Sequence, residues 1–112
     1  MPRDVTVVLD EMLETIARLQ AATEGRTLEH LASDWFFRMA TERAIEVLSE
    51  ACRHLPDDLL AGEPQIPWKR VRGMGNVLRH EYHRIAADVI WDVVTHDLPP
   101  LEAALLRLRS RP

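Results

Sequence analysis

Apolar side chains recur along most of the chain at alternating steps of three and four residues, the spacing of an amphipathic helix. The first such run comprises Val5, Leu9, Met12, Ile16 and Leu19. Asp4 is suited to cap the amino end of this run, and Gly25 is suited to end it. The pattern therefore predicts a first helix over about residues 5–24.

A second, longer run begins after Thr27, which can cap it, and contains no Pro or Gly from Leu28 to about His54. At about 1.5 Å per residue, one unbroken helix there would be roughly 40 Å long. The apolar seam of its later half comprises Ala40, Ala44, Val47, Ala51 and Leu55. Its earlier half carries more apolar residues than one stripe needs, namely Leu31, Trp35, Phe36, Phe37 and Met39. This excess predicts a buried helix or a subunit interface.

Residues 56–67 contain three prolines and a glycine and form the main predicted loop. The following helix, over residues 68–85, has an apolar seam of Trp68, Val71, Gly75, Leu78, Tyr82 and Ile85. Gly73 and Gly75 lie inside this helix, where each glycine costs about 1 kcal/mol against alanine. We therefore expect another helix, or a second chain, to pass close to both.

The last third of the chain contains a β-branched stretch, residues 88–94, that could form a strand. The chain offers no second candidate strand, and the apolar residues also pair at helical steps, so a helix is predicted. Pro99 and Pro100 are expected to break the chain before a short last helix that starts at Leu101. The predicted fold is all-α: an antiparallel up-and-down four-helix bundle with a short fifth helix, in one domain over residues 1–112.

Composition supports a globular protein: 46% of the 112 residues are apolar and 29% are charged. No stretch approaches the roughly 20 apolar residues of a membrane span, and the first residues do not resemble a signal peptide. Cys52 is the only cysteine, which excludes an internal disulfide. Its spacing with Leu48 and Leu55 predicts a buried structural thiol. We expect a cytoplasmic location.

The formal net charge of −4 has the wrong sign for binding nucleic acid through bulk electrostatics. Acidic residues crowd into the first two-thirds of the chain. Basic residues cluster in the 68–85 segment, namely Lys69, Arg70, Arg72, Arg79 and Arg84. The asymmetry predicts a local positive patch.

A second stripe of the 68–85 helix carries polar groups suited to anions: Arg72, Asn76, Arg79, His80 and His83. Guanidinium groups bind phosphate bidentately, and imidazole can move a proton near neutral pH. A basic surface helix, or an interface with an acidic partner, would give the same composition. His80 and His83 are one residue too close to ligate zinc as a His-Glu-x-x-His pair does, so no metal site is expected.

The same segment resembles a known family. The residues Ile66-Pro67-Trp68, Gly73-Met74-Gly75-Asn76, His80-Glu81-Tyr82 and Val89-Ile90-Trp91 are similar to those of the HepT-like toxins of the HEPN superfamily, which are small all-helical ribonucleases. The family signature is Arg, four residues, His, one residue, Tyr. His80 and Tyr82 match it, and Asn76 matches the Asn that follows the family's Arg. Gly75 stands at the position of that Arg.

The resemblance implies a metal-independent endoribonuclease, a hydrolase that needs no cofactor. It makes His80 the proton carrier and Asn76 a phosphate-orienting group, with Arg79 as the best substitute for the missing arginine. Arg72 and His83 are further candidate phosphate contacts. In the family, two copies of the motif face one another in a homodimer.

The resemblance also implies the toxin component of a type VII-like toxin–antitoxin pair that acts on RNA and not at a membrane. The partner would be a small nucleotidyltransferase antitoxin that neutralises the toxin by AMP addition to the motif tyrosine, here Tyr82. A structural tyrosine with a satisfied hydroxyl is the alternative for Tyr82. The alternative for the whole chain is a catalytically weak or inactive nucleotide- or RNA-binding module that acts through its nucleotidyltransferase partner.

Overall fold

A computed structural model describes residues 3–81 and 85–111, and within these ranges all regular secondary structure is helical. The elements are α1 (Val5–Thr23), α2 (Leu28–Ser33), α3 (Trp35–Cys52), α4 (Asp57–Leu60), α5 (Trp68–Glu81), α6 (Ala87–Asp92), the π-helix η1 (Val93–Asp97) and α7 (Leu98–Ser110). The protein is therefore all-α, as its sequence predicts.

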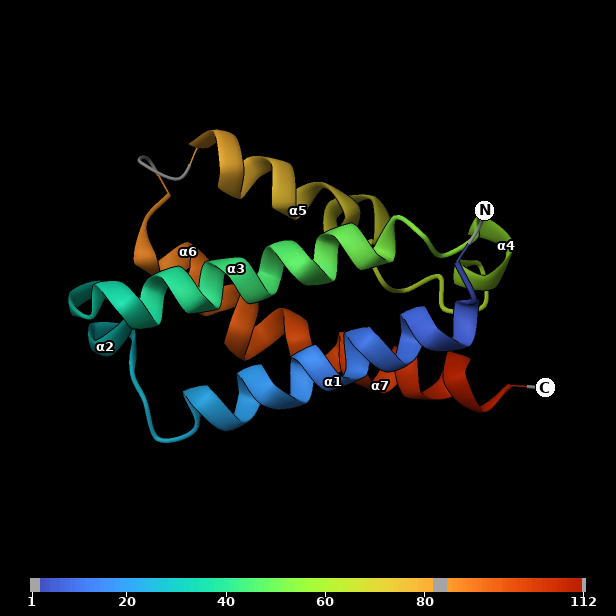
Figure 1. The fold of residues 1–112 in the computed structure, drawn as a ribbon, viewed down its shortest axis with the longest axis horizontal. Helices are drawn as coiled ribbons and strands as arrows, with labels where there is room; N and C mark the ends of the chain where they lie inside the picture. Colours follow the sequence, from blue (N-terminus) through green and yellow to red (C-terminus); the bar gives the residue numbers. More distant parts are fainter. Residues whose placement is uncertain (1–2, 82–84, 112) are drawn as a thin grey trace.

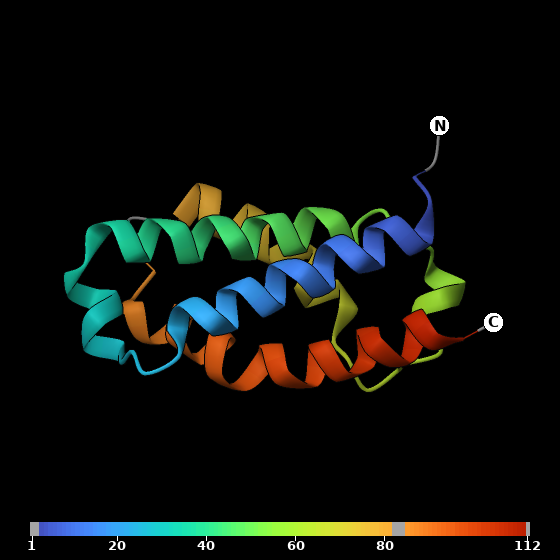
Figure 2. The same cartoon turned by 60° about the horizontal axis from the view of Figure 1, so that its bottom comes forward.

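Four rods make up the body of the molecule: α1, α3, α5, and the run of α6, η1 and α7 (Figure 1). Helix α3 packs against α5 on one side and against α1 on the other, and α1 also packs against α7. The views in Figures 1 and 2 agree that successive rods run in opposite directions along the long axis. None of the described helices is both long and apolar enough to cross a membrane.

Helix α1 forms within one residue of its predicted bounds. The Asp4 carboxylate accepts a hydrogen bond of 2.8 Å from the Thr6 amide at its amino end. Gly25 follows its carboxyl end with a φ of 74°, a conformation that glycine adopts without a Cβ penalty. The buried face of α1 comprises Val8, Leu9, Met12, Ile16 and Leu19, with Thr23 at its end.

The prediction of one unbroken helix from residue 28 to about 54 was wrong. Asp34 separates α2 from α3, with φ −100° and ψ 100°, and its carboxylate accepts from the Phe37 amide at 3.0 Å. An aspartate side chain competes with the helix for backbone amides and so favours a new helix start. The bend lets Leu31 and Phe37 both enter the core, while Trp35 and Phe36 are 72% and 76% exposed.

The helix that carries the candidate site is shorter than predicted, because α5 ends at Glu81 among the described residues and Ile85 is not helical. The helix predicted for residues 88–94 is confirmed as α6 and the start of η1. The predicted break at Pro99 and Pro100 was wrong, since both lie in the first turn of α7. Proline is tolerated there because the first amides of a helix have no partner inside it.

A buried carboxylate ties the 61–67 loop to the end of α7. Glu63 is 4% exposed, and its carboxylate accepts from Arg107 at 2.7 Å, Arg111 at 3.1 Å and Gln65 at 2.8 Å. The backbone carbonyl of Glu63 also accepts from the Trp68 indole at 3.0 Å. The arginines at the carboxyl end of the chain thus anchor the loop that leads into α5.

Candidate functional site

A buried serine of α3 forms two hydrogen bonds to the backbone of α5. The Ser49 hydroxyl donates to the Arg72 carbonyl at 2.9 Å and accepts from the Gly75 amide at 2.9 Å. Ser49 is 2% exposed, so both bonds are shielded from water. This contact brings α5 close to α3 at Gly75, and Asn76, Arg79 and His80 beside it stay exposed.

The two glycines of α5 have different surroundings. A Cβ on Gly75 would lie 3.1 Å from the Ser49 hydroxyl oxygen, which confirms the predicted close approach of a neighbouring helix. Nothing described in this chain lies within 4 Å of the corresponding position on Gly73, so no neighbouring helix of this chain approaches it, and a second chain there stays a prediction. Gly73 borders a cavity instead.

The exposed face of α5 brings together Asn76, Arg79 and His80. The Asn76 side-chain oxygen accepts a hydrogen bond from the Arg79 guanidinium. Another nitrogen of that guanidinium lies 3.7 Å from where a Cβ on Gly75 would stand. The arginine side chain therefore folds back over Gly75, beside the position at which the family signature has its arginine.

Arg70 and Arg72 do not join this cluster. The Arg72 guanidinium donates to the Leu55 carbonyl at 2.7 Å and to the Asp57 carboxylate at 2.8 Å, so it closes the turn after α3. Arg70 pairs with Asp97 of η1 at 3.0 Å. To contact a phosphate, Arg72 would have to release these partners or use guanidinium N–H groups that do not bind them. Tyr82, His83 and Arg84 lie outside the described residues.

Arg38 of α3 binds the backbone of Ile85, where the second described range begins. Its guanidinium donates to the Ile85 carbonyl at 2.6 Å and lies 3.8 Å from the Glu42 carboxylate. Glu42 is 4% exposed, and among the described residues one of its carboxylate oxygens has no hydrogen-bond partner. Burial raises the pKa of Glu42, against the opposing effect of Arg38.

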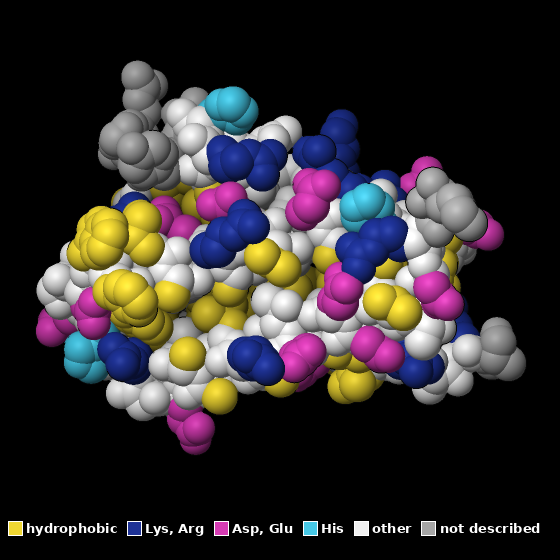
Figure 3. All heavy atoms as spheres, viewed as in Figure 1, with side chains coloured by type: hydrophobic (Ala, Val, Ile, Leu, Met, Phe, Trp, Pro, Cys, Tyr) yellow, Lys and Arg dark blue, Asp and Glu magenta, His cyan; other side chains and the backbone are white. Residues whose placement is uncertain are grey.

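The sequence pattern did not single out two arginines that lie beside Arg79. Arg3, Arg43 and Arg79 line one cavity of about 280 Å³ between the start of α1, α3 and α5. Carboxylates balance them: Arg3 pairs with Glu11, and Arg43 lies 3.4 Å from Glu46. Basic and acidic side chains alternate across this face in Figure 3. Only the packing of three helices joins these residues, so no spacing in the sequence signals them.

The described residues contain no group of three or more His, Cys, Asp and Glu side chains arranged to hold a metal ion. Cys52 is buried, as predicted. Burial raises the pKa of its thiol to about 11, which leaves it protonated and unreactive at neutral pH.

The fold and this helix face define a small all-α protein whose polar chemistry lies on one long helix. The family described as "Ribonuclease HepT-like" matches residues 12–108. The chain belongs to the HepT-like ribonuclease family.

Similar proteins carry related names. The chain is 29% identical over 110 residues to a "Probable ribonuclease HepT" of Thermococcus cleftensis, covering 98% of this chain and 100% of that protein. It is 33% identical over 100 residues to "Putative RNase MJ0127" of Methanocaldococcus jannaschii, covering 88% and 83% of the two chains. It is also 30% identical over 108 residues, 96% of its length, to "Gamma-glutamylcyclotransferase and putative RNase MJ0434" of the same organism. The chain spans 49% of that longer relative. No solved structure matches the chain.

Proposed function

We propose that this protein is an endoribonuclease that cleaves RNA without a metal ion, through Asn76, Arg79 and His80. The observation that carries the proposal is the Arg79 guanidinium, which Asn76 holds over Gly75, the position of the family arginine. Membership of the HepT-like ribonuclease family supports the same activity. A guanidinium in this place can neutralise charge that develops at phosphorus.

The proposed reaction uses the 2′-hydroxyl of RNA as the nucleophile. Its oxygen attacks the adjacent phosphorus and loses its proton to a base, while the 5′-oxygen leaves and takes up a proton. The products are a 2′,3′-cyclic phosphate and a 5′-hydroxyl end. His80 is exposed on α5 and carries one of the two protons. In a homodimer, the same residue of a second copy can carry the other.

The test is cleavage of a labelled single-stranded RNA by the purified protein, in the presence of a metal chelator. Wild-type protein should give 5′-hydroxyl ends. His80→Ala should lower the rate at least a hundredfold, the usual scale of general acid–base catalysis. His96→Ala is the matched control because His96 is also exposed but lies on η1, and it should cleave like wild type. Equal rates for wild type and His80→Ala would remove His80 from the mechanism.

Arginine variants test which guanidinium acts on the phosphate. Arg79→Ala should weaken RNA binding and cleavage strongly, since a charge-assisted contact contributes about 1.5–3 kcal/mol. Arg72→Ala should reduce stability more than cleavage, because Arg72 is bonded to Leu55 and Asp57. An unchanged rate for Arg79→Ala would contradict the assigned role.

We further propose that the protein is the toxin of a toxin–antitoxin pair and acts in the cytoplasm. Its partner would be a nucleotidyltransferase that transfers AMP from ATP to the Tyr82 hydroxyl and releases pyrophosphate. Incubation with the partner and ATP should add the mass of one AMP group to wild type and none to Tyr82→Phe. Adenylylated protein should no longer cleave RNA. Addition of AMP to Tyr82→Phe would place the acceptor elsewhere.

The second candidate is a module that binds nucleotides or RNA and is catalytically weak. The presence of Gly75 at the family's arginine position favours it. Undetectable cleavage by well-folded wild type, together with AMP addition by the partner, would support this candidate over the ribonuclease.

A further inference from the structure

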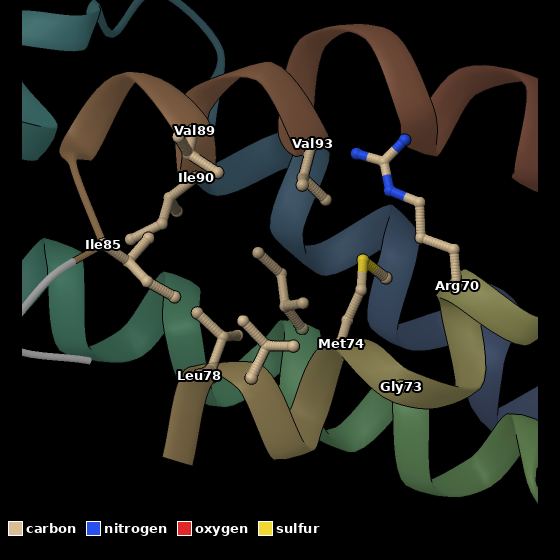
Figure 4. Close-up of a pocket in the computed structure, with 10 residues that line it drawn as sticks. Arg70, Gly73, Met74, Leu78, Ile85, Val89, Ile90 and Val93 are labelled. Carbon is tan, nitrogen blue, oxygen red and sulfur yellow. The ribbon is translucent and has the colours of Figure 1, made fainter. Parts of the chain in front are cut away.

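An apolar cavity of about 250 Å³ lies between α5 and the helix formed by α6 and η1 (Figure 4). Ile45 of α3 contributes to it, Met74 and Leu78 line it from α5, and Ile90 and Val93 line it from the other side. Among the described residues that line it, Arg70 is the one with a charged side chain. Neither Arg79 nor His80 is among the residues that line it.

Gly73 is the glycine of α5 that borders this cavity. The residue lines the cavity, and a Cβ placed on it would touch nothing within 4 Å. Close packing therefore does not explain a glycine in the middle of α5, where it costs about 1 kcal/mol against alanine. A larger side chain at this position would project into the space between the helices.

The opposite wall contains the π-helical turn. Val93, the first residue of η1, lines the cavity, and Asp97, its last residue, pairs with Arg70 across the gap at 3.0 Å. A π turn is wider than an α turn and occurs often at functional sites. Here the π-helix carries both Val93, which lines the cavity, and Asp97, which pairs with Arg70.

A ligand carboxylate can take the place of Asp97 in the ion pair with Arg70. Both side chains are partly exposed, and ion pairs of this kind contribute little to stability. A carboxylate from a ligand can therefore replace Asp97 on the guanidinium, whose fork binds carboxylates bidentately. The combination of an apolar cavity with one cation at its edge complements an apolar chain that ends in a negative charge.

We propose that this cavity binds a straight-chain carboxylate, with its chain among the apolar side chains and its carboxylate on Arg70. The cavity volume indicates the length of the carboxylate's hydrocarbon chain. At about 30 Å³ for each water-sized group, a cavity of about 250 Å³ holds roughly eight groups. Octanoate therefore matches its capacity. This inference does not depend on the ribonuclease activity.

Calorimetric titration of the full chain with butanoate, hexanoate, octanoate and dodecanoate, below their micelle concentrations, tests the proposal. Affinity should rise about fourfold per methylene, from about 0.8 kcal/mol for each buried CH₂. It should level off near eight carbons. No binding of octanoate at millimolar concentration, or an affinity independent of chain length, would overturn the proposal.

Variants separate the contribution of the charge from that of the cavity. Arg70→Gln should weaken octanoate about tenfold and leave 1-octanol within twofold, because only octanoate carries a charge. Arg109→Gln is the matched control, since Arg109 also forms a partly exposed ion pair, with Asp10 at 2.8 Å, and should not alter binding. Equal losses in the two arginine variants would contradict the assignment of Arg70.

Gly73→Leu should fill the cavity and abolish binding of both octanoate and octanol while α5 stays folded. A second filling variant, Val93→Phe, approaches from the opposite wall and serves if Gly73→Leu does not fold. Melting temperatures confirm that each variant is folded. Unchanged octanoate binding in a folded filling variant would place the ligand elsewhere.

Discussion

At the scale of single residues, the two glycines of α5 show how one residue type serves two purposes. Gly75 lets the Ser49 hydroxyl reach the backbone of α5, and the Arg79 side chain lies over it. A Cβ on Gly73 would meet nothing within 4 Å, and the residue borders a cavity. The sequence gives both the same local context, so only their surroundings distinguish them.

Alanine at the two positions should therefore change stability in opposite directions. Gly73→Ala should raise the free energy of unfolding by up to about 1 kcal/mol, the helix propensity gain. Gly75→Ala should lower it by about 1 kcal/mol, because the added Cβ lies 3.1 Å from a serine oxygen that two hydrogen bonds hold in place. Denaturant unfolding of the two variants measures both effects. Stabilisation by both would show that Ser49 moves freely.

At the scale of elements, helix ends decide the shape of the chain. Asp34 bends the chain between α2 and α3 and so sends Leu31 and Phe37 into the core while it exposes Trp35 and Phe36. At the other end of the molecule, Glu63 joins the loop before α5 to the last turn of α7. Each of these features depends on one carboxylate that accepts hydrogen bonds.

Asp34→Ala should lower the free energy of unfolding by about 1 kcal/mol, since it removes the acceptor of the Phe37 amide at the start of α3. Asp34→Asn, which keeps a side-chain oxygen, is the control and should cost much less. Thermal unfolding distinguishes the two. Equal stability of all three proteins would show that the bend does not depend on the cap.

The two buried carboxylates should respond to pH with opposite sign. Hydrogen bonds from Arg107 above all lower the pKa of Glu63, so its ionised form stabilises the fold above the unfolded pKa of about 4.3. That stabilisation is lost as the pH falls through the lower folded pKa. Burial raises the pKa of Glu42, so its ionised form opposes folding at neutral pH, and protonation on acidification removes this penalty.

Glutamine at each position tests these signs. Glu63→Gln should be less stable than wild type at pH 7, and the difference should shrink below about pH 4. Glu42→Gln should be at least as stable as wild type at pH 7, and any advantage should shrink as the pH falls through the raised pKa of Glu42. Urea unfolding between pH 3 and pH 7 measures both differences. A stabilising Glu63→Gln change would contradict the assigned network.

At the scale of the whole molecule, one end of the bundle presents apolar surface to solvent. Apolar side chains gather there around the first turn of α3 (Figure 3), where Trp35 and Phe36 are mostly exposed. Adjacent exposed aromatic residues are typical of contact surfaces, because leaving them in water is unfavourable. The bend at Asp34 buries Leu31 and Phe37 of the apolar-rich segment. Trp35 and Phe36 of the same segment stay exposed.

The protein should therefore be a homodimer at micromolar concentration, as measured by light scattering. The double change Trp35→Ser and Phe36→Ser should shift it toward monomer if this surface forms the contact. Leu106→Ser is the control, because Leu106 is an exposed apolar residue of α7 and should not affect association. A monomeric wild-type protein would contradict the prediction.

Local sequence determined the helices themselves. The three-four spacing places α1, most of α5 and the buried face of each, and Asp4, Gly25 and Thr27 mark helix ends, because caps and periodicity act over a few neighbouring residues. The same spacing puts Asn76, Arg79 and His80 on one face, since their separation is fixed by the helix alone.

Tertiary structure decided what lies more than one turn apart. The grouping of Arg3 and Arg43 with Arg79 depends on which helices pack together. So does the commitment of Arg72 to the turn after α3. Such contacts join residues distant in the chain, and a local pattern carries no information about them. For that reason the candidate site could be found from the sequence, whereas the cavity beside Gly73 could be seen only in the folded molecule.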